Sequence, residues 1–443
     1  MSSQLSTSAR CRPFESSSSA VTDSAPVPSA PDIFAPVVIV GASLGALRTA
    51  EALRRAGYAG PLTVIGEEPH APYNRPPLSK EVLSTGVSHD AVAFPARAAT
   101  ADVEWMLGAR VVSADLEART VTTDDGRRHP WRALVIATGL RSRRLDLPLI
   151  AGRHTVRTLD DAMALRDELV PGARVVMVGA GFIGCEVAAT ARTLGCEVTI
   201  VAPGVEPLIR PLGVVVGAEL RRRHEQHGVA FALGRTVSAI LGDGAFEGLQ
   251  LDTGEVIAGN VLVEAIGSVC NTGWLDGTSL DLTDGVLADS ALRAVSRDGT
   301  VHDDIYVVGD IARFPNRMFD DVARRIEHWN IPTDTGKRVG AVLGAWLADD
   351  GSFAELVTRE FTPMPAFWSN QFEVGVQAYG LPGLTDGDIR ILQGELCGEV
   401  AVGYYRADRL VGVVGFGLKA ELLPYRQEIA TLAAGHVAGR VAG

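Results

Sequence analysis

Two stretches of the chain repeat the same order of hydrophobic and polar positions. The first comprises a strand, a turn, a helix with its closing glycine, and a second strand: Pro36–Val40, 41–46, Leu47–Ala56 with Gly57, and Leu62–Ile65. Continuous apolar runs of four or five residues are typical of parallel strands buried on both faces. A glycine directly after a helical pattern commonly ends the helix. The pattern therefore predicts a βαβ unit.

The same pattern returns between residues 174 and 201. Its strand, turn, helix and second strand are expected at Arg174–Val178, Gly179–Gly184, Cys185–Leu194 and Val198–Val201. A βαβ unit that begins with a glycine-rich turn is the first part of a nucleotide-binding domain of the Rossmann type. Two such units predict two of these domains in one chain.

The remaining hydrophobic runs complete this picture. Further strands are expected at Ala133–Ala137, Val261–Ile266 and Ile305–Val308, the last of which ends in Gly309-Asp310. After residue 355 the pattern changes to short β segments, followed by a helix: Val400–Tyr405, Leu410–Phe416 and a helix from Leu422. We therefore expect an α/β fold with two Rossmann-like dinucleotide-binding domains and a C-terminal α+β domain.

Composition narrows the class of protein. The formal net charge of −12 disfavours a nucleic-acid partner. No apolar run reaches the roughly 18 residues of a membrane span, and residues 1–35, rich in Ser, Ala and Pro, lack the apolar core of a secretory signal. These residues predict a disordered tail. Five scattered cysteines without C-x-x-C spacing predict reduced thiols in the cytoplasm, without a metal site.

The second glycine motif has the complete dinucleotide-binding pattern. Gly179, Gly181 and Gly184 stand between a predicted strand and a predicted helix. In this context the first glycine permits a tight turn, the second lets the backbone approach a pyrophosphate, and the third permits close packing of helix on strand. The phosphates would lie at the helix N-terminus, where free N–H groups favour anions. We predict dinucleotide binding here.

The first glycine motif is degenerate. Gly41 is present, but Ser43 and Ala46 occupy the second and third glycine positions. Glu67 follows the second strand, 26 residues after Gly41, and could accept hydrogen bonds from a ribose. A solvated loop acid is the alternative interpretation of Glu67. This motif predicts a second dinucleotide site whose pyrophosphate geometry differs slightly.

The second βαβ unit lacks the residue that would select between NADH and NADPH. Ala202, 23 residues after Gly179, stands where an acid would favour NADH and a nearby arginine would favour NADPH. Glu206 and Arg210 lie further along the chain. The choice between NADH and NADPH stays open.

Several short segments resemble one family. Pro72-Tyr-Asn-Arg-Pro-Pro-Leu-Ser-Lys80 resembles the signature of oxygenase-coupled NAD(P)H-dependent ferredoxin reductases, FAD flavoproteins related in fold to glutathione reductase. The similarity continues in Ala137-Thr-Gly139, Gly309-Asp310, Glu327-His-Trp329 and Phe367-Trp-Ser-Asn-Gln371. It thus extends over nearly all of the chain after residue 35.

The resemblance implies roles for individual residues. An FAD-binding domain would span residues 36–148 and 269–350, an NAD(P)-binding domain 149–268, and the C-terminal domain 355–443. Asp310 would bind the ribityl chain, and Lys80 and Glu186 would form an ion pair near the flavin N5. The further residues implied in FAD binding are Gly41, Gly45, Glu67, Arg75, Val111, Arg141 and Trp329. Lys80 would then stabilise the anionic reduced flavin, while Glu186 holds the lysine in place.

The cysteine positions restrict the electron acceptor. Disulfide reductases of this fold carry a C-x4-C pair after the first βαβ unit, but no cysteine lies between Cys11 and Cys185. A flavin–dithiol relay is therefore excluded at that site. A one-electron acceptor, a ferredoxin that feeds a cytochrome P450 or a Rieske oxygenase, fits best. A rubredoxin or small-molecule reductase, or a flavin-bound signalling module resembling apoptosis-inducing factor, remain alternatives.

A basic segment flanks the implied flavin contacts and is a candidate docking surface for a ferredoxin. Its basic residues are Arg313, Arg317, Arg324, Arg325, Lys337 and Arg338, with His328 besides. Four acids partly offset them: Asp320, Asp321, Glu327 and Asp334. An ordinary mixed-charge surface is the alternative. Asn370 stands where the family often has Asp, and this substitution has no evident consequence.

Overall fold

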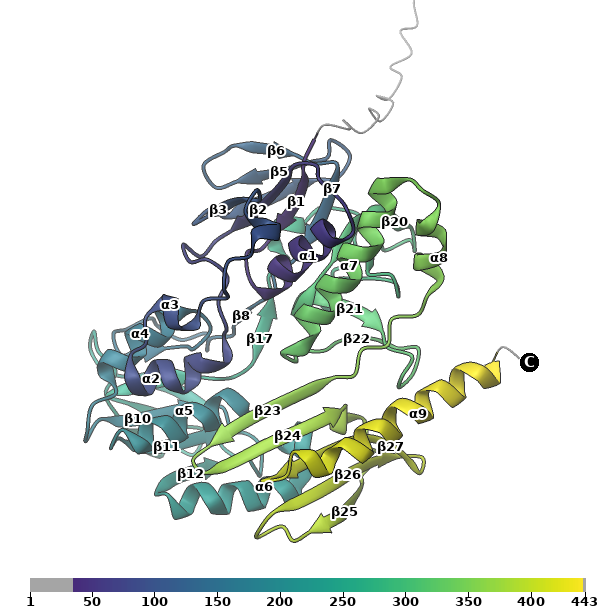
Figure 1. The fold of residues 1–443 in the computed structure, drawn as a ribbon. Coiled ribbons are helices and arrows are strands. Elements are labelled where there is room, and N and C mark those ends of the chain that lie inside the picture. The colour runs from purple at the N-terminus through teal and green to yellow at the C-terminus, as the bar shows by residue number, and fades with distance from the viewer. Residues whose placement is uncertain (1–34, 441–443) are drawn as a thin grey trace, which may run out of the picture. The chain divides into compact units, whose positions relative to one another are not determined.

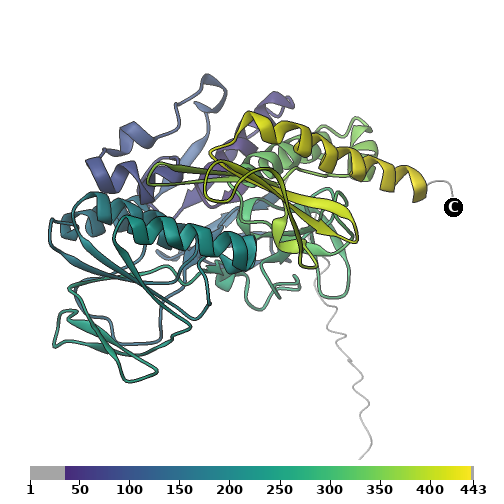
Figure 2. The ribbon, with the colours of Figure 1, turned by 90° about the horizontal axis from the view of Figure 1, so that it is seen from below.

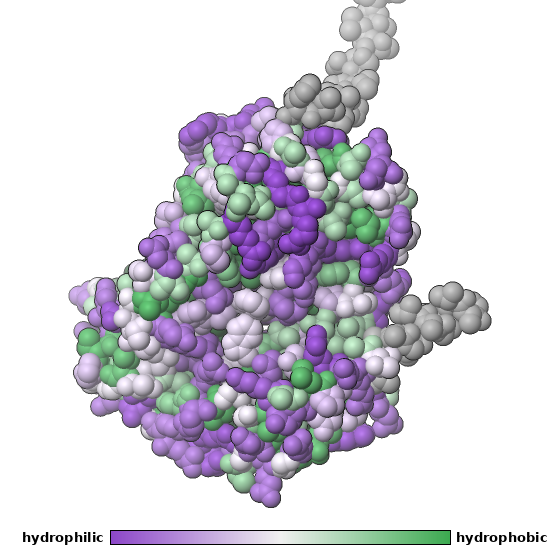
Figure 3. Space-filling view, viewed as in Figure 1, coloured by the Kyte–Doolittle hydropathy of each residue, from purple (hydrophilic) through white to green (hydrophobic). Residues whose placement is uncertain are grey.

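The computed structural model describes residues 35–440, except the side chains of residues 432–440. The tail predicted at 1–35 lies outside the described residues, apart from Ala35. Among the helices of the described part, none is both long and apolar enough to cross a membrane. On the face shown in Figure 3, hydrophobic residues lie scattered among hydrophilic ones.

The first βαβ unit belongs to a six-stranded sheet (Figure 1). Its order is β19 (Arg293–Val295), β20 (Val301–Val307), β7 (Ala133–Ile136), β1 (Val37–Val40), β2 (Leu62–Gly66) and β3 (Glu104–Leu107). The five strands from β20 to β3 are parallel, and β19 pairs with β20 antiparallel. Every residue of β1, β2 and β7 is buried, as continuous apolar runs predict.

Two helices, α1 (Leu44–Arg55) and α7 (Asn330–Ala348), lie side by side on this sheet (Figure 1). A stripe of glycines on α7 permits their close approach. A Cβ atom on Gly340 would lie 2.3 Å from Ala52 Cβ, and one on Gly344 would lie 2.5 Å from Ala56 Cβ. Gly336 faces Arg48 in the same way, at 2.9 Å. The close packing of α7, the last helix of the first dinucleotide fold, on α1 thus depends on glycines, which have no side chain.

The second βαβ unit belongs to a five-stranded parallel sheet. Its order is β12 (Val229–Leu233), β11 (Glu197–Ala202), β10 (Arg174–Val178), β16 (Val261–Glu264) and β9 (Arg153–His154). Its helices are α4 (Leu159–Glu168), α5 (Phe182–Thr193) and α6 (Ile209–Gln226). The same segment of the chain also forms a three-stranded antiparallel sheet of β13 (Val237–Leu241), β14 (Gly248–Leu251) and β15 (Val256–Ala258).

The chain passes between the two dinucleotide folds twice. The strands β8 (Leu140–Ser142) and β17 (Ser268–Cys270) pair antiparallel where the chain leaves and re-enters the first fold. Two small sheets complete this part: β4 (Val111–Asp115), β5 (Thr120–Thr123) and β6 (Arg128–Pro130), and β18 (Val286–Leu287), β21 (Ala312–Pro315) and β22 (Ala323–Arg325). Two short helices, α2 (Glu81–Thr85) and α3 (His89–Val92), follow the first glycine motif.

The C-terminal part is an antiparallel sheet with a covering helix. After α8 (Ser352–Thr358) come β23 (Ala366–Gln371), β24 (Val374–Gly380), β25 (Asp388–Gly394), β26 (Val400–Arg406) and β27 (Arg409–Phe416), in the order β23-β24-β27-β26-β25. The helix α9 (Leu423–Arg440) lies across this sheet (Figure 2). Alternation along β24 gives one buried and one partly exposed face. The predicted α/β fold with a C-terminal α+β part is therefore confirmed.

Both helices that follow glycine motifs start earlier than predicted. The helix expected at Leu47 begins at Leu44, and the helix expected at Cys185 begins at Phe182. The third small residue of each motif therefore lies in the first helical turn and not in the turn before it. A Cβ atom on Gly184 would lie 2.2 Å from the carbonyl oxygen of Gly179. Position 184 requires a glycine because α5 begins directly against the end of β10.

The packing of α7 on α1 provides a test of this fold. Gly340→Val should lower the free energy of unfolding by about 1–3 kcal/mol, because its branched side chain overlaps Ala52. Lys337→Val is the control, since it places the same side chain at an exposed position of the same helix without this overlap and costs only about 0.5 kcal/mol in helix propensity. Urea unfolding of both variants measures the difference. Equal stability of the two variants would contradict the proposed close packing.

Candidate functional site

A cavity of about 1710 Å³ lies where the three large sheets meet. It is lined by residues that follow β1, β7 and β20, by the first turn of α5, and by β23. Ligands of open parallel sheets bind beyond the carboxyl ends of the strands, where this cavity lies. Its volume exceeds the roughly 300–1,000 Å³ of an ordinary small-molecule pocket, and an extended ligand of dinucleotide size fits it.

The first glycine motif forms one wall of the cavity. Gly41 has a φ of +107°, and a Cβ atom there would lie 2.2 Å from the carbonyl oxygen of Ala137. Gly45 in the first turn of α1 is confined in the same way by Val308. Ser43 precedes the helix in an extended conformation and makes no capping hydrogen bond with its side chain. The N–H groups of the first turn therefore stay available for an anion at the cavity.

The second glycine motif forms another wall. Gly179 adopts the same φ of +107°, with its Cβ position 2.3 Å from the carbonyl oxygen of Ala265. A Cβ atom on Gly181 would meet no atom within 4 Å, and this residue lines the cavity directly before α5. The three glycines of this motif thus meet the three conditions of a dinucleotide turn: a tight turn, open approach and close helix packing.

An ion pair joins these two walls. Lys80 Nζ lies 2.6 Å from Glu186 Oε2, with side chains that are 14% and 5% exposed. Lys80 stands between the 3-10 turn Pro76–Ser79 and α2, and Glu186 lies on α5. Ser79 also donates a hydrogen bond to Oε2 of the carboxylate. The two predicted catalytic residues are therefore in direct contact at the cavity, although their role stays a prediction.

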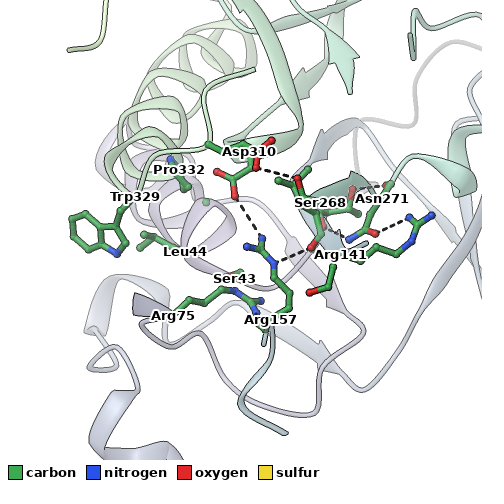
Figure 4. A pocket seen from close by; sticks show the side chains of 18 of the residues that line it. Ser43, Leu44, Arg75, Arg141, Arg157, Ser268, Asn271, Asp310, Trp329 and Pro332 are labelled. Atoms are coloured by element: carbon green, nitrogen blue, oxygen red, sulfur yellow. Dashed lines mark hydrogen bonds and ion pairs between the residues drawn. The ribbon is translucent and has the colours of Figure 1, made fainter. Parts of the chain in front are cut away.

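Asp310 lies at the end of β20 and faces two arginines across the cavity (Figure 4). Burial raises the pKa of its carboxyl, and the positive charge of Arg157, 3.5 Å away, opposes this effect. The carboxylate is thus buried at the cavity with one arginine as its ion-pair partner. Hydroxyl groups of a polyol chain would supply such donors, so this environment fits the predicted ribityl contact.

Arg157 connects Asp310 to the predicted residue Arg75. Arg75 donates to the backbone carbonyl of Arg157 and forms an ion pair with Glu68, both at 2.5 Å. Burial lowers the pKa of Arg157, and the charge of Arg75 adds to this effect. Burial also lowers the pKa of Arg75, but Glu68, Tyr73 and Asp310 together outweigh this effect and the pKa is raised. Glu68 and Arg157 had no recognisable signal in the sequence.

The remaining predicted cofactor contacts lie around the same cavity. Glu67 follows β2 and is exposed at the cavity wall, and Val111 begins β4. Arg141 on β8 donates hydrogen bonds to Asn271 Oδ1 and to the carbonyl of Cys270, both at 3.1 Å (Figure 4). All of these residues line the cavity, and their contact with a cofactor stays a prediction.

Two tryptophans stand at the cavity and are partly open to solvent. Trp329 and Trp368 are 38% and 37% exposed, and their rings meet edge to face with centroids 5.2 Å apart. The indole Nε1 of Trp329 donates to Asn74 Oδ1 at 3.0 Å. The neighbouring His328 is half-buried, and burial lowers its pKa to about 4. The aromatic side chains of this wall are therefore uncharged near pH 7, while Glu327 beside them also lines the cavity.

The basic segment Arg313–Arg338 is largely neutralised by ion pairs. Six carboxylates pair with its arginines: Asp281 with Arg313, Asp321 and Glu360 with Arg317, Asp320 with Arg324, and Asp284 and Glu327 with Arg325. Arg338 donates to two backbone carbonyls, and Lys337 is exposed. A ferredoxin-docking role for this segment stays a prediction, with less net positive charge than the sequence suggested.

The thiols of the described residues lie away from the cavity surface. Cys185, Cys196, Cys270 and Cys397 are free, and the cavity lining contains none of them. Burial raises the pKa of the Cys185 thiol to about 12, and the nearby Glu186 charge adds to this effect. A thiol held neutral in this way is a poor nucleophile. Within this part of the chain no cysteine is placed to exchange electrons with a ligand in the cavity.

Comparison with known proteins agrees with this geometry. Residues 35–336 match the family described as pyridine nucleotide-disulphide oxidoreductase. The chain is 38% identical over 368 residues to the anthranilate 1,2-dioxygenase system ferredoxin–NAD(+) reductase component of Burkholderia cepacia, covering 81% of this chain and 85% of the relative. It is 30% identical over 402 residues to rhodocoxin reductase of Rhodococcus erythropolis, covering 89% of each.

Solved structures give the same result. The covalent putidaredoxin reductase–putidaredoxin complex has a TM-score of 0.81 at 27% identity, covering 89% of this chain and 93% of that chain. The ferredoxin reductase of the CYP199A2 system from Rhodopseudomonas palustris has a TM-score of 0.77 at 29% identity, covering 91% and 93%. These matches confirm the resemblance inferred from the segment Pro72–Lys80. The chain therefore belongs to the pyridine nucleotide-disulphide oxidoreductase family.

Proposed function

We propose that this protein is an FAD-dependent reductase that takes electrons from a nicotinamide nucleotide and passes them singly to a ferredoxin of an oxygenase system. One observation carries the proposal: the Lys80–Glu186 ion pair faces a cavity that lies between two glycine motifs and is lined by no cysteine. The relatives named above are ferredoxin reductases of dioxygenase and rhodocoxin systems. The acceptor ferredoxin would serve a Rieske-type oxygenase or a cytochrome P450.

The residues at the first glycine motif fit FAD. Gly41, Gly45 and the first turn of α1 would hold the pyrophosphate, while Glu67 would accept from the adenosine ribose. Asp310 would bind the ribityl chain. Bound FAD supplies a ring that accepts a hydride and releases its two electrons one at a time. The two electrons of each nucleotide reduce two ferredoxins, with release of one proton.

Lys80 would act through its positive charge at the part of the site where the flavin is reduced. Its ammonium is fixed by Glu186, Ser79 and the backbone carbonyl of Pro76, at distances of 2.6–3.1 Å. A cation held in place before the reaction stabilises negative charge that develops near it without further reorganisation. The residue that sets this position is Glu186, which is nearly fully buried.

The second glycine motif would bind the electron donor. Gly181 and the first turn of α5 would approach the pyrophosphate of NADH or NADPH. Ala202 ends β11 and is 4% exposed, so the usual ribose acceptor is absent there. Glu206 cannot replace it readily, because Arg221 holds both of its carboxylate oxygens at 2.8 and 3.1 Å.

Electrons would leave on the side of Trp329 and Trp368. These side chains line the cavity and are also partly exposed, so they connect the proposed flavin position to the surface. The basic segment Arg313–Arg338 flanks this position, and exposed Lys337 on α7 could contribute to docking.

The predicted domain limits and location belong to this proposal. The first fold would bind FAD through residues 36–148 and 269–350, and the second would bind the donor through residues 149–268. Residues 355–443 would form the third domain. Free thiols in the described chain are typical of a reducing compartment, which supports a cytoplasmic location.

Anaerobic reduction tests this function directly. The purified protein should show an oxidised flavin spectrum that NADH or NADPH bleaches, because the donor and FAD would share one cavity. Cytochrome c reduction should then require added ferredoxin. A colourless protein, or a flavin that neither nucleotide reduces, would contradict the proposal. Ferredoxin-independent turnover with a quinone would indicate a small-molecule reductase, and a long-lived reduced complex without acceptor turnover would indicate a signalling module.

Removal of the Lys80 charge should slow the hydride step. We expect Lys80→Met to lower the limiting rate of flavin reduction on the order of 10- to 100-fold, since a fixed charge beside the reacting end is lost. Stopped-flow absorbance with saturating donor measures this rate. Lys419→Met, which removes an exposed lysine of the C-terminal domain, is the control and should behave as wild type. An unchanged rate in Lys80→Met would exclude the electrostatic role.

An acid at position 202 should shift donor preference toward NADH. In Ala202→Glu the new carboxylate would accept hydrogen bonds from a free ribose and repel a 2′-phosphate, and the NADH-to-NADPH ratio of kcat/KM should rise at least about tenfold. Val256→Glu adds the same charge at an exposed position of the same domain and should leave the ratio unchanged. An unchanged ratio in Ala202→Glu would show that the end of β11 does not contact the ribose.

A further inference from the structure

The Glu186 carboxylate is held by groups from three separate parts of the fold. Lys80 and Ser79 contact Oε2 from the segment between the first glycine motif and α2, at 2.6 and 2.5 Å. The other oxygen, Oε1, accepts a hydrogen bond of 2.6 Å from the hydroxyl of Ser369 on β23. The C-terminal sheet therefore supplies a direct contact to the carboxylate of the proposed reduction site.

Ser369 is itself held by a buried chain of hydrogen bonds. Gln371 donates from Nε2 to the Ser369 hydroxyl oxygen at 2.9 Å. The other amide atom of Gln371, Oε1, lies 2.8 Å from Nε2 of His224 on α6. Ser369, Gln371 and His224 are all at most 1% exposed. The chain thus runs from α6 through the sheet to the carboxylate without contact with solvent.

The direction of this chain follows from its chemistry. A 2.6 Å contact between the Ser369 hydroxyl and a carboxylate oxygen requires a proton between them, and only the hydroxyl carries one. The hydroxyl must then accept from the amide of Gln371, whose oxygen faces His224. Burial lowers the pKa of His224, so the ring is neutral and carries its hydrogen on Nε2. Each group donates toward Glu186.

The alternation of β23 places this chain opposite the exposed aromatic pair. Phe367, Ser369 and Gln371 are buried on one face of the strand, while Trp368 and Asn370 are exposed on the other. Phe367 packs against Phe182 of α5, with ring centroids 4.8 Å apart. The register of β23 on α5 therefore fixes the position of Ser369 relative to Glu186.

We propose that Ser369 is a positioning residue for the reduction site: its hydroxyl, oriented by Gln371 and His224, fixes the Glu186 carboxylate and through it the Lys80 ammonium. The inference rests on the proposed function. It makes the C-terminal sheet a functional part of the flavin-reducing machinery and not only a platform beside it. Without the hydroxyl, Oε1 loses its hydrogen-bond donor from β23, and the carboxylate can rotate away from the lysine.

The charged groups near this carboxylate are few. Lys80 faces it from the segment after Ser79, and Cys185 on α5 is a neutral thiol with a pKa raised to about 12 by burial. His224 reaches it only through Gln371 and is neutral, as is His328 against Phe367, where burial lowers its pKa to about 4. Lys80 is therefore the charged group in direct contact with this carboxylate.

The test compares three substitutions on one strand. Ser369→Ala removes the hydroxyl, Ser369→Thr restores it, and Asn370→Ala changes the exposed face of β23 as a matched control. Stopped-flow reduction across pH separates the limiting rate from donor affinity, and spectroelectrochemistry gives the potential of the bound flavin. Crystal structures give the distance from Lys80 Nζ to Glu186 Oε2 in each variant. Urea unfolding of the FAD-free proteins measures stability.

In Ser369→Ala we expect about a tenfold lower limiting rate at unchanged donor affinity, as for loss of one hydrogen bond to a charged group. The pH–rate profile should move, the flavin potential should become more negative, and the distance from Lys80 to Glu186 should lengthen. Ser369→Thr should recover all four quantities. Asn370→Ala should match wild type throughout.

A purely structural role would give a different result. If Ser369→Ala lowers only stability or FAD retention, with rate, pH profile, potential and distance as in wild type, the proposal is wrong. Failure of the proposed function is distinguishable, because the wild-type flavin would then not be reduced by either nucleotide. In that event the distance between Lys80 and Glu186 still decides whether Ser369 positions the carboxylate.

Discussion

The buried ion pair between Lys80 and Glu186 constrains how the parts of this protein fit together. Removal of two charges from water costs several kcal/mol per ion, and their attraction compensates only with good geometry and further hydrogen bonds. Here Ser79 and Ser369 supply those bonds. Because the donors come from the first fold and the C-terminal sheet, and the carboxylate from the second fold, satisfying one buried charge requires all three parts to be correctly assembled.

The parallel sheets explain why the cavity lies at this junction. In each dinucleotide fold the strands end on the same side, and the glycine turns and helix N-termini lie at that end. The crossings at β8 and β17 orient the two folds so that both ends face one space. In the proposed function, an extended cofactor and a donor would share that space, with their pyrophosphates at different helices and their reactive ends near Lys80.

The sequence predicted those features that depend on backbone geometry or on a long specific motif. Gly179, Gly181 and Gly184 could be placed because each performs a distinct steric task, and the structure gives each the expected surroundings. Lys80 was identified from its nine-residue segment. The strand positions followed from apolar runs, whereas both helix starts were wrong by three residues, because a small residue in the first turn resembles a residue in the preceding loop.

Features that depend on long-range packing had no sequence signal. Arg157 and Ser369 meet their partners from segments more than 100 residues away. Ser369 lies in the family-like segment Phe367–Gln371, but no local pattern indicates that its partner is Glu186. The glycine stripe of α7 has the same character, since Gly340 matters only because Ala52 lies opposite. The basic segment was overestimated for a related reason: its arginines count as charges in the sequence, but Asp281 and Glu360 come from elsewhere to neutralise them.

The lack of a thiol at the cavity changes what the surrounding residues must do. In a dithiol relay, a sulfur pair takes both electrons and carries them away from the ring. Here the described cavity is lined by no cysteine, and a partly exposed tryptophan pair occupies the wall toward solvent. The strand β23 carries Trp368 on its outer face and Ser369 on its inner face. In the proposed function, one strand would thereby help to position both the charge that assists electron entry and the aromatic surface by which electrons leave.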